Sequence, residues 1–566
     1  TRPRSDHVFS LSRDLGCQNK KKETMELVVL ALLMVILTPA VVFAQPPHDK
    51  RNVLVIIADD VGFETSVYNH TACKMPNLAR LSQQSVTIRN AYTSVSSCSP
   101  SRSVILTGMP QHQNGMYGLH HQENHFMSFD TVKSLPLLLK PYGIHTGMIG
   151  KKHVGPKYVY KFDFERDSDT LNMLQCARNI TQMKLYVREF FAEQNNSTPF
   201  MLYMGFNDAH RCGTDKFGTF CEKFGNGEEG MGIIEDWKPF YYEPKDVEVP
   251  YYLPDTLTTR IDITKQYTSL SRLDSGIGML LAELERVGHL NDTLIIYTAD
   301  NGIPFPNAKT NLFEPGMGEP MLISNPFDKN RWGQVSDSMT STMDIVPTVL
   351  DWFGIPMPGT EEKTPKPVPK TTEPVPKTTE PPTLEKTQPS GTKLTGHSMI
   401  PITASEPVSG WDHVYASHNF HEVTMYYPMR VLRNRRYRLI HNLNNRAPYP
   451  LATDLYSCPT FLEILNNTIS GQPTYWFKTL EDYYYRDEWE LYDLQDDPHE
   501  LKNLADDPDH QEIRQNMTAQ LHSWMMETDD TWHCFPHGVR YGPNHGCGPK
   551  YDEPTQQGNP QVNIIH

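Results

Sequence analysis

The sequence predicts an α/β fold that carries a smaller C-terminal α+β domain. Four apolar runs lack the alternation of a half-exposed strand, which is typical of parallel strands covered on both faces: NVLVIIADD, HTGMIGKKH, PFMLYMGFNDAH and TLIIYTADNG. The segment TRIDITKQYTSLSRLDSGIGMLLAELERVG, residues 259–288, predicts a long helix between the third and the fourth run. Strands that alternate with helices in this way indicate an α/β architecture.

Polar side chains end each of the four predicted strands. They are Asp59 and Asp60, Lys151 and His153, Asp208 and His210, and Asp300 and Asn301. In an open α/β sheet, ligands bind beyond the carboxyl ends of the strands. We therefore expect these four polar clusters to meet in one crevice.

The C-terminal part has a different pattern. Residues 421–443 and 489–508 predict antiparallel strands joined by turns, followed by a closing helix, so we assign residues 45–400 to a catalytic domain and 401–566 to the α+β domain. Between them, residues 356–393 form a Pro/Thr-rich insert in which PVPKTTE occurs twice in tandem, at 367–373 and 374–380. Such a segment cannot bury enough apolar surface to fold, so we expect an extended surface insert.

The N-terminal region predicts entry into the secretory pathway. Residues 25–44 resemble a signal peptide with an apolar core at 27–37 and a cleavage site after Ala44, and residues 1–24 are interpreted as an upstream or artefactual segment. A signal anchor is the alternative for this region; we expect no other stretch to span a membrane. Seven sequons agree with secretion, at Asn69, Asn179, Asn195, Asn196, Asn291, Asn466 and Asn516.

Charge and cysteine content limit the function and the compartment. The formal net charge of −15 argues against a general nucleic-acid binder, whereas protonation of the 23 histidines in an acidic compartment would make the charge positive and remove repulsion of a polyanionic substrate. Cys212 with Cys221, and Cys534 with Cys547, bracket short polar loops and could form local disulfides in an oxidising lumen. The pairing of Cys73, Cys98, Cys176 and Cys458 stays open.

The polar residues at the strand ends suggest two kinds of chemistry. Asp59, Asp60, Asp300 and Asn301 supply only oxygen ligands, which select Ca²⁺ or Mg²⁺, although a helix cap and an Asn-Gly turn are the structural alternatives. Cations and imidazoles suited to a tetrahedral oxyanion such as sulfate or phosphate accompany them: Arg102, Lys151, Lys309, His153 and His210.

The stretch SSCSPSRSVILTG, residues 96–108, resembles the signature of the sulfatase family. Cys98-Ser99-Pro100-Ser101-Arg102 supplies C-x-P-S-R, and Thr107-Gly108 follows after four residues. From about Arg51 to Cys547, apart from the insert, the chain resembles the sulfamidase branch of that family, on the segments GMPQHQNGMYGLH, IGKKHVGP, HRCG, GTFCEKFGNGE, DNGIPFP, HEVTMYYPMR and WELYDLQDDPHE. The resemblance implies a sulfatase/alkaline-phosphatase-like mixed sheet flanked by helices.

The same resemblance implies the site chemistry. Cys98 would be oxidised to formylglycine by the formylglycine-generating enzyme, and modified Cys98 would complete the shell of one Ca²⁺ ion held by Asp59, Asp60, Asp300 and Asn301. The implied catalytic residues are Cys98, Arg102, Lys151, His153 and His210, and the implied substrate-binding residues are Lys151, His210 and Lys309. Position 309 holds lysine where this branch is expected to have arginine. The lysine keeps the positive charge but cannot make a bidentate hydrogen-bonded contact.

The implied activity is removal of the N-linked sulfate from terminal N-sulfoglucosamine of heparan sulfate, in the lysosome, by a homodimeric enzyme. An O-sulfatase of the same fold, acting on a glycosaminoglycan or another sulfated sugar, is the main alternative. A phosphatase of the related metal-dependent superfamily has no use for C-x-P-S-R. A catalytically inactive, glycan-binding homologue is disfavoured because all the expected residue types of the site are present.

Overall fold

The computed structural model describes residues 51–194, 198–212, 216–359, 394–541 and 546–549. Four predictions from the sequence therefore lie wholly or largely outside the described residues: the segment 1–24, the signal peptide 25–44, the sequons at Asn195 and Asn196, and the Pro/Thr-rich insert beyond residue 359. Within the described part of the chain, no helix is both long enough and apolar enough to cross a bilayer.

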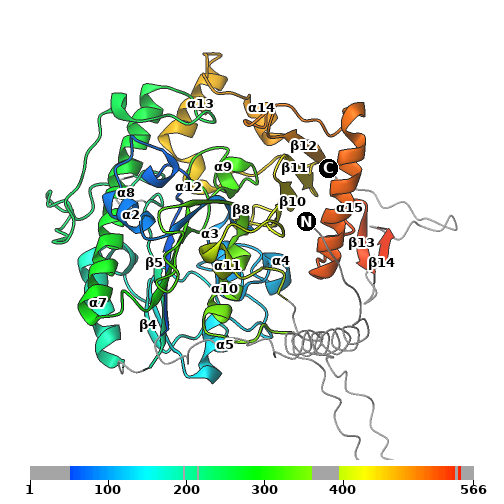
Figure 1. Ribbon diagram of the computed structural model, residues 1–566. Helices are drawn as coiled ribbons and strands as arrows, with labels where there is room; N and C mark the ends of the chain where they lie inside the picture. The colour runs from blue at the N-terminus through cyan, green and yellow to red at the C-terminus, as the bar shows by residue number, and fades with distance from the viewer. Residues whose placement is uncertain (1–50, 195–197, 213–215, 360–393, 542–545, 550–566) are drawn as a thin grey trace, which may run out of the picture. The chain divides into compact units, whose positions relative to one another are not determined.

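An eight-stranded mixed sheet forms the centre of the fold (Figure 1). Its order is β4 (Phe164–Asp167), β3 (His145–Gly150), β5 (Phe200–Gly205), β1 (Asn52–Ala58), β6 (Thr293–Ala299), β7 (Met321–Ser324), β2 (Val86–Tyr92) and β8 (Val335–Ser341). The first five strands are parallel, whereas β7 runs antiparallel to β6 and β2, and β2 pairs parallel with β8. The four predicted strands are neighbours, in the order β3, β5, β1 and β6, which confirms the predicted α/β fold.

Helices cover both faces of this sheet because alternate residues of each buried strand point to opposite sides. Leu54 and Ile56 of β1 join a core with α2 (Pro76–Ser82), α7 (Ile180–Glu193) and α8 (Leu257–Val287), which lie to the left of the sheet in Figure 1. Val53, Val55 and Ile57 join a second core with α3 (Cys98–Thr107), α5 (Leu135–Leu139) and α10 (Ile345–Trp352). Helix α8 confirms the helix predicted at 259–288.

Short helices connect these elements. They are α4 (Gln111–Asn114), α6 (Met173–Ala177), α9 (Glu314–Met317), α11 (Ile400–Ala404), α12 (Thr453–Tyr456), α13 (Pro459–Ile469) and α14 (Leu480–Tyr484). The sequence did not predict α12 and α13, which lie between the two strand segments of the C-terminal region.

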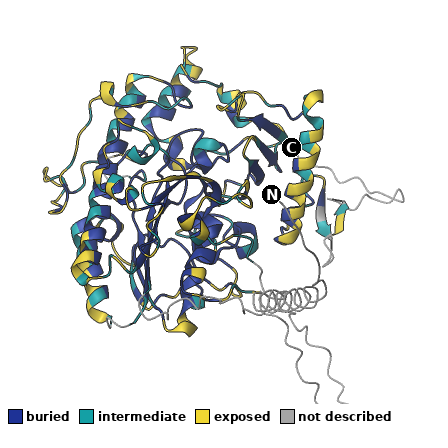
Figure 2. Cartoon of the chain, in the orientation of Figure 1, coloured by how far each residue is buried: buried dark blue, intermediate teal, exposed yellow. Residues whose placement is uncertain are grey.

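The C-terminal region forms a second sheet, which is wholly antiparallel, in the order β12 (Trp489–Asp493), β11 (Tyr437–Asn442), β10 (Met429–Asn434) and β9 (His413–His418). Helix α15 (Gln511–Glu527) packs on one face through Leu521 and Trp524, and it is the closing helix predicted from the sequence. The other face shares a core with Phe313 and Met317 of the first region, and Figure 2 shows the strands of both sheets as buried. The boundary at residue 400 stays a prediction.

The structure pairs the cysteines that bracket the two short loops. Cys212 bonds to Cys221 and Cys534 to Cys547, with Cα–Cα distances of 5.7 and 5.4 Å, inside the range that a disulfide requires. The second bridge links the segment after α15 to the hairpin of β13 (Gly538–Tyr541) and β14 (Gly546–Pro549). Among the described cysteines, Cys73, Cys98, Cys176 and Cys458 are buried and free.

A buried ion pair fastens the closing helix to the second sheet. Arg430 of β10 donates two parallel hydrogen bonds to Asp530, which follows α15, and the Nη2–Oδ1 bond is 2.9 Å long. Burial opposes the charge of this carboxylate, but Arg430 holds the pKa of Asp530 at about 2. Its folded-state pKa is therefore below the unfolded value of roughly 3.9.

We expect Asp530→Asn to lower the unfolding free energy by about 3 kcal/mol or more, because it removes one partner of a buried pair. The contribution of the native carboxylate is complete above pH ~4 and is lost as the pH falls through its folded value. Denaturant unfolding at several pH values should thus show that the variant's unfolding free energy is lower than the parent's by a constant amount from pH 5 to 7. The difference should shrink below pH ~4. The exposed Asp496→Asn is the control; an equal deficit in both variants would contradict the role of the pair.

Candidate active site

The polar clusters that follow β1, β3, β5 and β6 lie at the same edge of the sheet, as the sequence predicted. Backbone hydrogen bonds tie the first residues beyond the strands to their neighbours. Asp59 N donates to Asp208 O (3.1 Å), Lys151 N to Gly205 O (2.7 Å) and Asp300 N to Ala58 O (3.1 Å). The backbone at this edge is thus fixed by the sheet itself.

Cys98 is the first residue of α3, and every residue of this helix is buried. Arg102 follows one turn later, so it lies on the same helix face as Cys98. The helix ends at Gly108, whose φ of 68° is in the left-handed region and where an added Cβ would lie 3.1 Å from Val346. The glycine of the signature is therefore needed to end the helix and to let α10 approach.

Three carboxylates and one amide converge beside Cys98. The Cys98 thiol lies 3.7 Å from Asp59 Oδ1. Asp300 Oδ1 accepts the backbone N–H of Asp60 at 3.1 Å, and Asn301 Nδ2 donates to Asp60 Oδ1 at 2.7 Å. All four predicted metal ligands are fully buried.

These residues fit a hard divalent cation. Asn301 Oδ1 is buried without a hydrogen-bond partner, so one neutral oxygen donor is left for a ligand. Burial raises the pKa of Asp60 to about 6 and that of Asp300 to about 7, which shows how costly these crowded carboxylates are without a neutralising charge. Asp59, Asp60, Cys98 and His210 each offer a ligand atom within 4.8 Å of one another. An oxygen-rich donor set of this kind suits Ca²⁺ or Mg²⁺.

Buried cations balance the carboxylates. Lys151 Nζ contacts Asp59 Oδ2, and Lys309 Nζ lies 2.9 Å from Asp60 Oδ2. Arg102 donates through Nε to Asp300 Oδ2 at 2.8 Å and through Nη1 to the carbonyl of Lys151, and its Nη2 forms an ion pair with Asp300 Oδ2 at 2.8 Å. The guanidinium of Arg102 therefore orients a predicted metal ligand and the Lys151 backbone.

Three histidines complete the centre. His153, whose φ of 58° is in the strained left-handed region, is hydrogen-bonded through Nε2 to His121 Nδ1. His210 Nε2 lies 3.1 Å from Lys309 Nζ and 3.8 Å from Asp60 Oδ2. Burial, with Lys309 next, lowers the pKa of His210 to about 3, and burial also lowers the pKa of His153 well below its usual value. Both shifts favour the neutral form of the imidazole.

The environment of Cys98 disfavours a plain thiolate. Burial raises the pKa of the Cys98 thiol far above its ordinary value, although Lys151 and Lys309 oppose this shift. The reactive form of an unmodified cysteine is the thiolate. An unmodified Cys98 would therefore be a poor nucleophile at this position.

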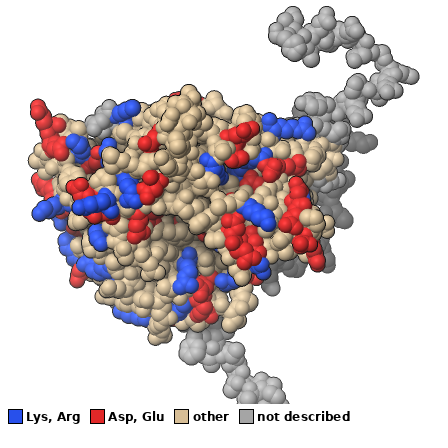
Figure 3. Space-filling model, turned by 90° about the horizontal axis from the view of Figure 1, so that it is seen from above, with Lys and Arg blue, Asp and Glu red and all other residues tan. Residues whose placement is uncertain are grey.

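A pocket of about 700 Å³ opens onto these residues and reveals members of the site that the sequence did not predict. Asp454 of α12 lies 3.3 Å from Lys309 Nζ, and His421 Nδ1 lies 2.8 Å from Ser97 Oγ, next to Cys98. His421 is the first residue of the family-like segment HEVTMYYPMR, and His121 directly follows GMPQHQNGMYGLH. No sequence motif marks Asp454. The face drawn in Figure 3 intersperses acidic and basic side chains, and Arg102, Lys151 and Lys309 are buried beneath the surface.

Comparison with known proteins places this geometry in a family. The sulfatase family model matches residues 51–355, and the model described as the C-terminal region of N-sulphoglucosamine sulphohydrolase matches residues 465–527. The chain belongs to the sulfatase family. This sulfatase is 50% identical over 491 residues to the human N-sulphoglucosamine sulphohydrolase, covering 86% of this chain and 92% of that protein. It is 23% identical to an ulvan-active sulfatase of Formosa agariphila, over 85% of this chain and 76% of that one.

Solved structures confirm the sulfatase fold. A structure described as a complex with its substrate D-glucosamine-2-N,6-O-disulfate superposes with a TM-score of 0.57 at 17% identity, covering 85% of this chain and 98% of that one. A 2-O glycosaminoglycan sulfatase superposes with a TM-score of 0.56 at 19% identity, covering 89% and 98% of the two chains. The fold is thus the predicted mixed sheet with a separate antiparallel sheet in the C-terminal region, and the family match and the human relative make this sulfatase a hydrolase.

The metal assignment predicts the behaviour of Asp300→Asn. Loss of this carboxylate should abolish bound Ca²⁺, measured by elemental analysis of the purified protein, and lower kcat by roughly a hundredfold or more, since charge support for the reacting group is removed. Asp274→Asn is the matched control, because Asp274 is a buried carboxylate that caps α2 by accepting the N–H groups of Asn77 and Leu78. Full calcium content in Asp300→Asn would contradict the assignment.

Proposed function

We propose that this sulfatase removes the N-linked sulfate from the non-reducing terminal N-sulfoglucosamine of heparan sulfate. The observation that carries the proposal is 50% identity over 92% of the human N-sulphoglucosamine sulphohydrolase. The separate match of residues 465–527 to the model of that enzyme's C-terminal region supports it.

The nucleophile is proposed to be formylglycine derived from Cys98. The buried position of Cys98 and its raised thiol pKa favour a modified residue over a thiolate. The hydrated aldehyde would supply two hydroxyls on one carbon, one to attack sulfur and the other to expel sulfate afterwards. An ordinary serine in this place could attack once but would stay sulfated.

The proposed calcium ligands are Asp59, Asp60, Asp300, Asn301 and modified Cys98. A calcium ion held there would polarise a sulfate oxygen and support the attacking group. Lys151, in contact with Asp59, and Lys309, in contact with Asp60, would neutralise the charge of the bound sulfate. Lys309 acts as a point charge, since an ammonium cannot make the bidentate contact of a guanidinium.

Departure of the amine requires a proton, and Lys309, with His210 beside it, can supply it. Although burial opposes its charge, Asp454 and Asp60 hold the pKa of Lys309 well above its usual value. His210, 3.1 Å away, is neutral at the same time. The proton for the leaving nitrogen is therefore carried by Lys309 and shared with His210, while neutral His153 is free to accept a proton when sulfate is expelled.

The proposed place of action is the lysosome, reached through the secretory pathway, where the formylglycine-generating enzyme would first modify Cys98. The sequons at Asn69, Asn291, Asn466 and Asn516 are exposed, as glycosylation requires, and Asn179 is half-buried at the start of α7. The proposed assembly is a homodimer. Each of these statements remains a prediction.

A substrate comparison tests the activity. The secreted enzyme should release free glucosamine and sulfate from N-sulfoglucosamine at acidic pH, and it should turn over glucosamine-6-sulfate at least a hundredfold more slowly, roughly the discrimination available to a shaped site. Chromatography of the products with an amine-reactive label distinguishes the two reactions. Faster desulfation of the 6-O-sulfate would contradict the proposal and favour an O-sulfatase.

A further inference from the structure

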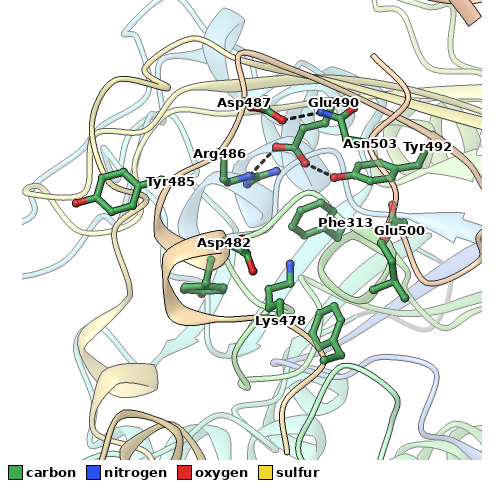
Figure 4. A pocket seen from close by; sticks show the side chains of 13 residues that line it. Phe313, Lys478, Asp482, Tyr485, Arg486, Asp487, Glu490, Tyr492, Glu500 and Asn503 are labelled. Carbon is green, nitrogen blue, oxygen red and sulfur yellow. Dashed lines mark hydrogen bonds and ion pairs between the residues drawn. The ribbon is translucent and has the colours of Figure 1, made fainter. Parts of the chain in front are cut away.

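A second pocket of about 310 Å³ lies between the C-terminal sheet and the catalytic region. Figure 4 shows its lining side chains, which come mainly from the segment containing α14, from β12 and from the loop that follows β12, together with Phe313 of the catalytic region. None of its lining residues lines the pocket at Cys98, so the two hollows are separate.

The carboxylates of this pocket are already engaged. Glu490 accepts hydrogen bonds from Arg486, Tyr492 and Asn442. Glu500 accepts the backbone N–H of Glu314 and pairs with Arg438. The remaining two are also bonded, Asp482 to Thr479 and Asp487 to Asn503.

The cations, in contrast, have donors to spare. Lys478 Nζ carries three N–H groups, yet its one hydrogen-bond acceptor among the described residues is Asn307 Oδ1, at 2.9 Å. Arg486 uses Nε for Glu490 and Nη1 for the sulfur of Met429, while its buried Nη2 has no hydrogen-bond partner. Lys478 and Arg486 therefore both have N–H groups left for a ligand, whereas Glu500 Oε1, a lining carboxylate oxygen without a hydrogen bond, already lies 2.8 Å from Arg438 Nη1.

The two cations also share one aromatic ring. Lys478 Nζ lies 4.7 Å and the Arg486 guanidinium 4.5 Å from the centroid of Phe313, and in Figure 4 the ammonium end of Lys478 points toward this ring. Burial, with Arg486 next, lowers the pKa of Lys478 to about 8. Two like charges held together in this way are stabilised by an anion between or beside them.

We propose that this second pocket binds an anionic oxygen group, a sulfate or a sugar-borne sulfate or carboxylate, through Lys478 and Arg486. The aromatic walls, which include Phe477 and Tyr485, suit the apolar face of a sugar ring that carries such a group. The site is independent of the chemistry at Cys98 and does not rest on the proposed substrate.

The pocket is joined to the catalytic loop by one hydrogen bond. Asn307, the acceptor of Lys478, lies two residues before Lys309 on the segment between β6 and α9. An anion that draws the ammonium of Lys478 away would release the Asn307 side chain. The second site is thus placed to sense either product sulfate or a neighbouring part of a sulfated chain.

Crystals of the full-length enzyme soaked in saturating selenate, an anomalous scatterer with the shape of sulfate, test the proposal. We expect an anomalous peak within hydrogen-bonding distance of Lys478 Nζ in the parent enzyme. The peak should persist in Lys245→Gln, which changes an exposed lysine outside both pockets, and vanish in Lys478→Gln. Absence of a peak in the parent pocket, or its persistence in Lys478→Gln, would overturn the proposal.

Equilibrium dialysis against radiolabelled sulfate measures how many sulfate ions each chain binds in solution. Lys478→Gln should bind one sulfate fewer per chain than the parent and Lys245→Gln, and equal binding by all three proteins would overturn the site. A heparan-derived disaccharide added to selenate-loaded parent crystals distinguishes the sources. Loss of the peak at Lys478 assigns the pocket to a sugar-borne anion, and its retention assigns it to free sulfate.

Discussion

The structure depends on the burial of a balanced set of charges at the carboxyl edge of one sheet. Three carboxylates, Asp59, Asp60 and Asp300, and three cations, Arg102, Lys151 and Lys309, are almost wholly excluded from solvent. Unpaired charges in such a place cost several kcal/mol each, so every member must face a partner of opposite sign. This requirement sets how the side chains beyond β1, β3 and β6 pair with one another and, through Arg102, with α3, the helix that begins at Cys98.

The C-terminal region is part of the same electrostatic arrangement. Asp454 contacts Lys309, and His421 is hydrogen-bonded to Ser97, the residue that directly precedes α3. Arg438 and Arg486 of the second region in turn approach Glu314 and Phe313 of the first. The site therefore contains residues of both regions, and a change in the second region can alter the surroundings of Lys309.

The sequence predicted what depends on local composition and missed what depends on distant pairing. Continuous apolar runs identified β1, β3, β5 and β6, and the polar residues after them suggested the metal and sulfate ligands that we propose. Strand β8 alternates exposed and buried residues only at its start, and β4 and β7 have four residues each. These three strands are therefore too short or too irregular to show a recognisable hydrophobic pattern in the sequence. Asp454 belongs to a four-residue helix whose sequence matches no functional motif. Its contact with Lys309 joins residues that are distant in the sequence, so it is visible only in the folded structure.

Peptide mass spectrometry across Cys98 of the active, secreted enzyme tests the central claim most directly. The buried thiol beside Asp59 and Lys151 is, in this account, only the precursor of the working nucleophile. The account predicts that the peptide containing residues 96–102 carries an aldehyde at position 98, in a fraction that rises and falls with specific activity. A fully active preparation in which Cys98 remains a free thiol would contradict it.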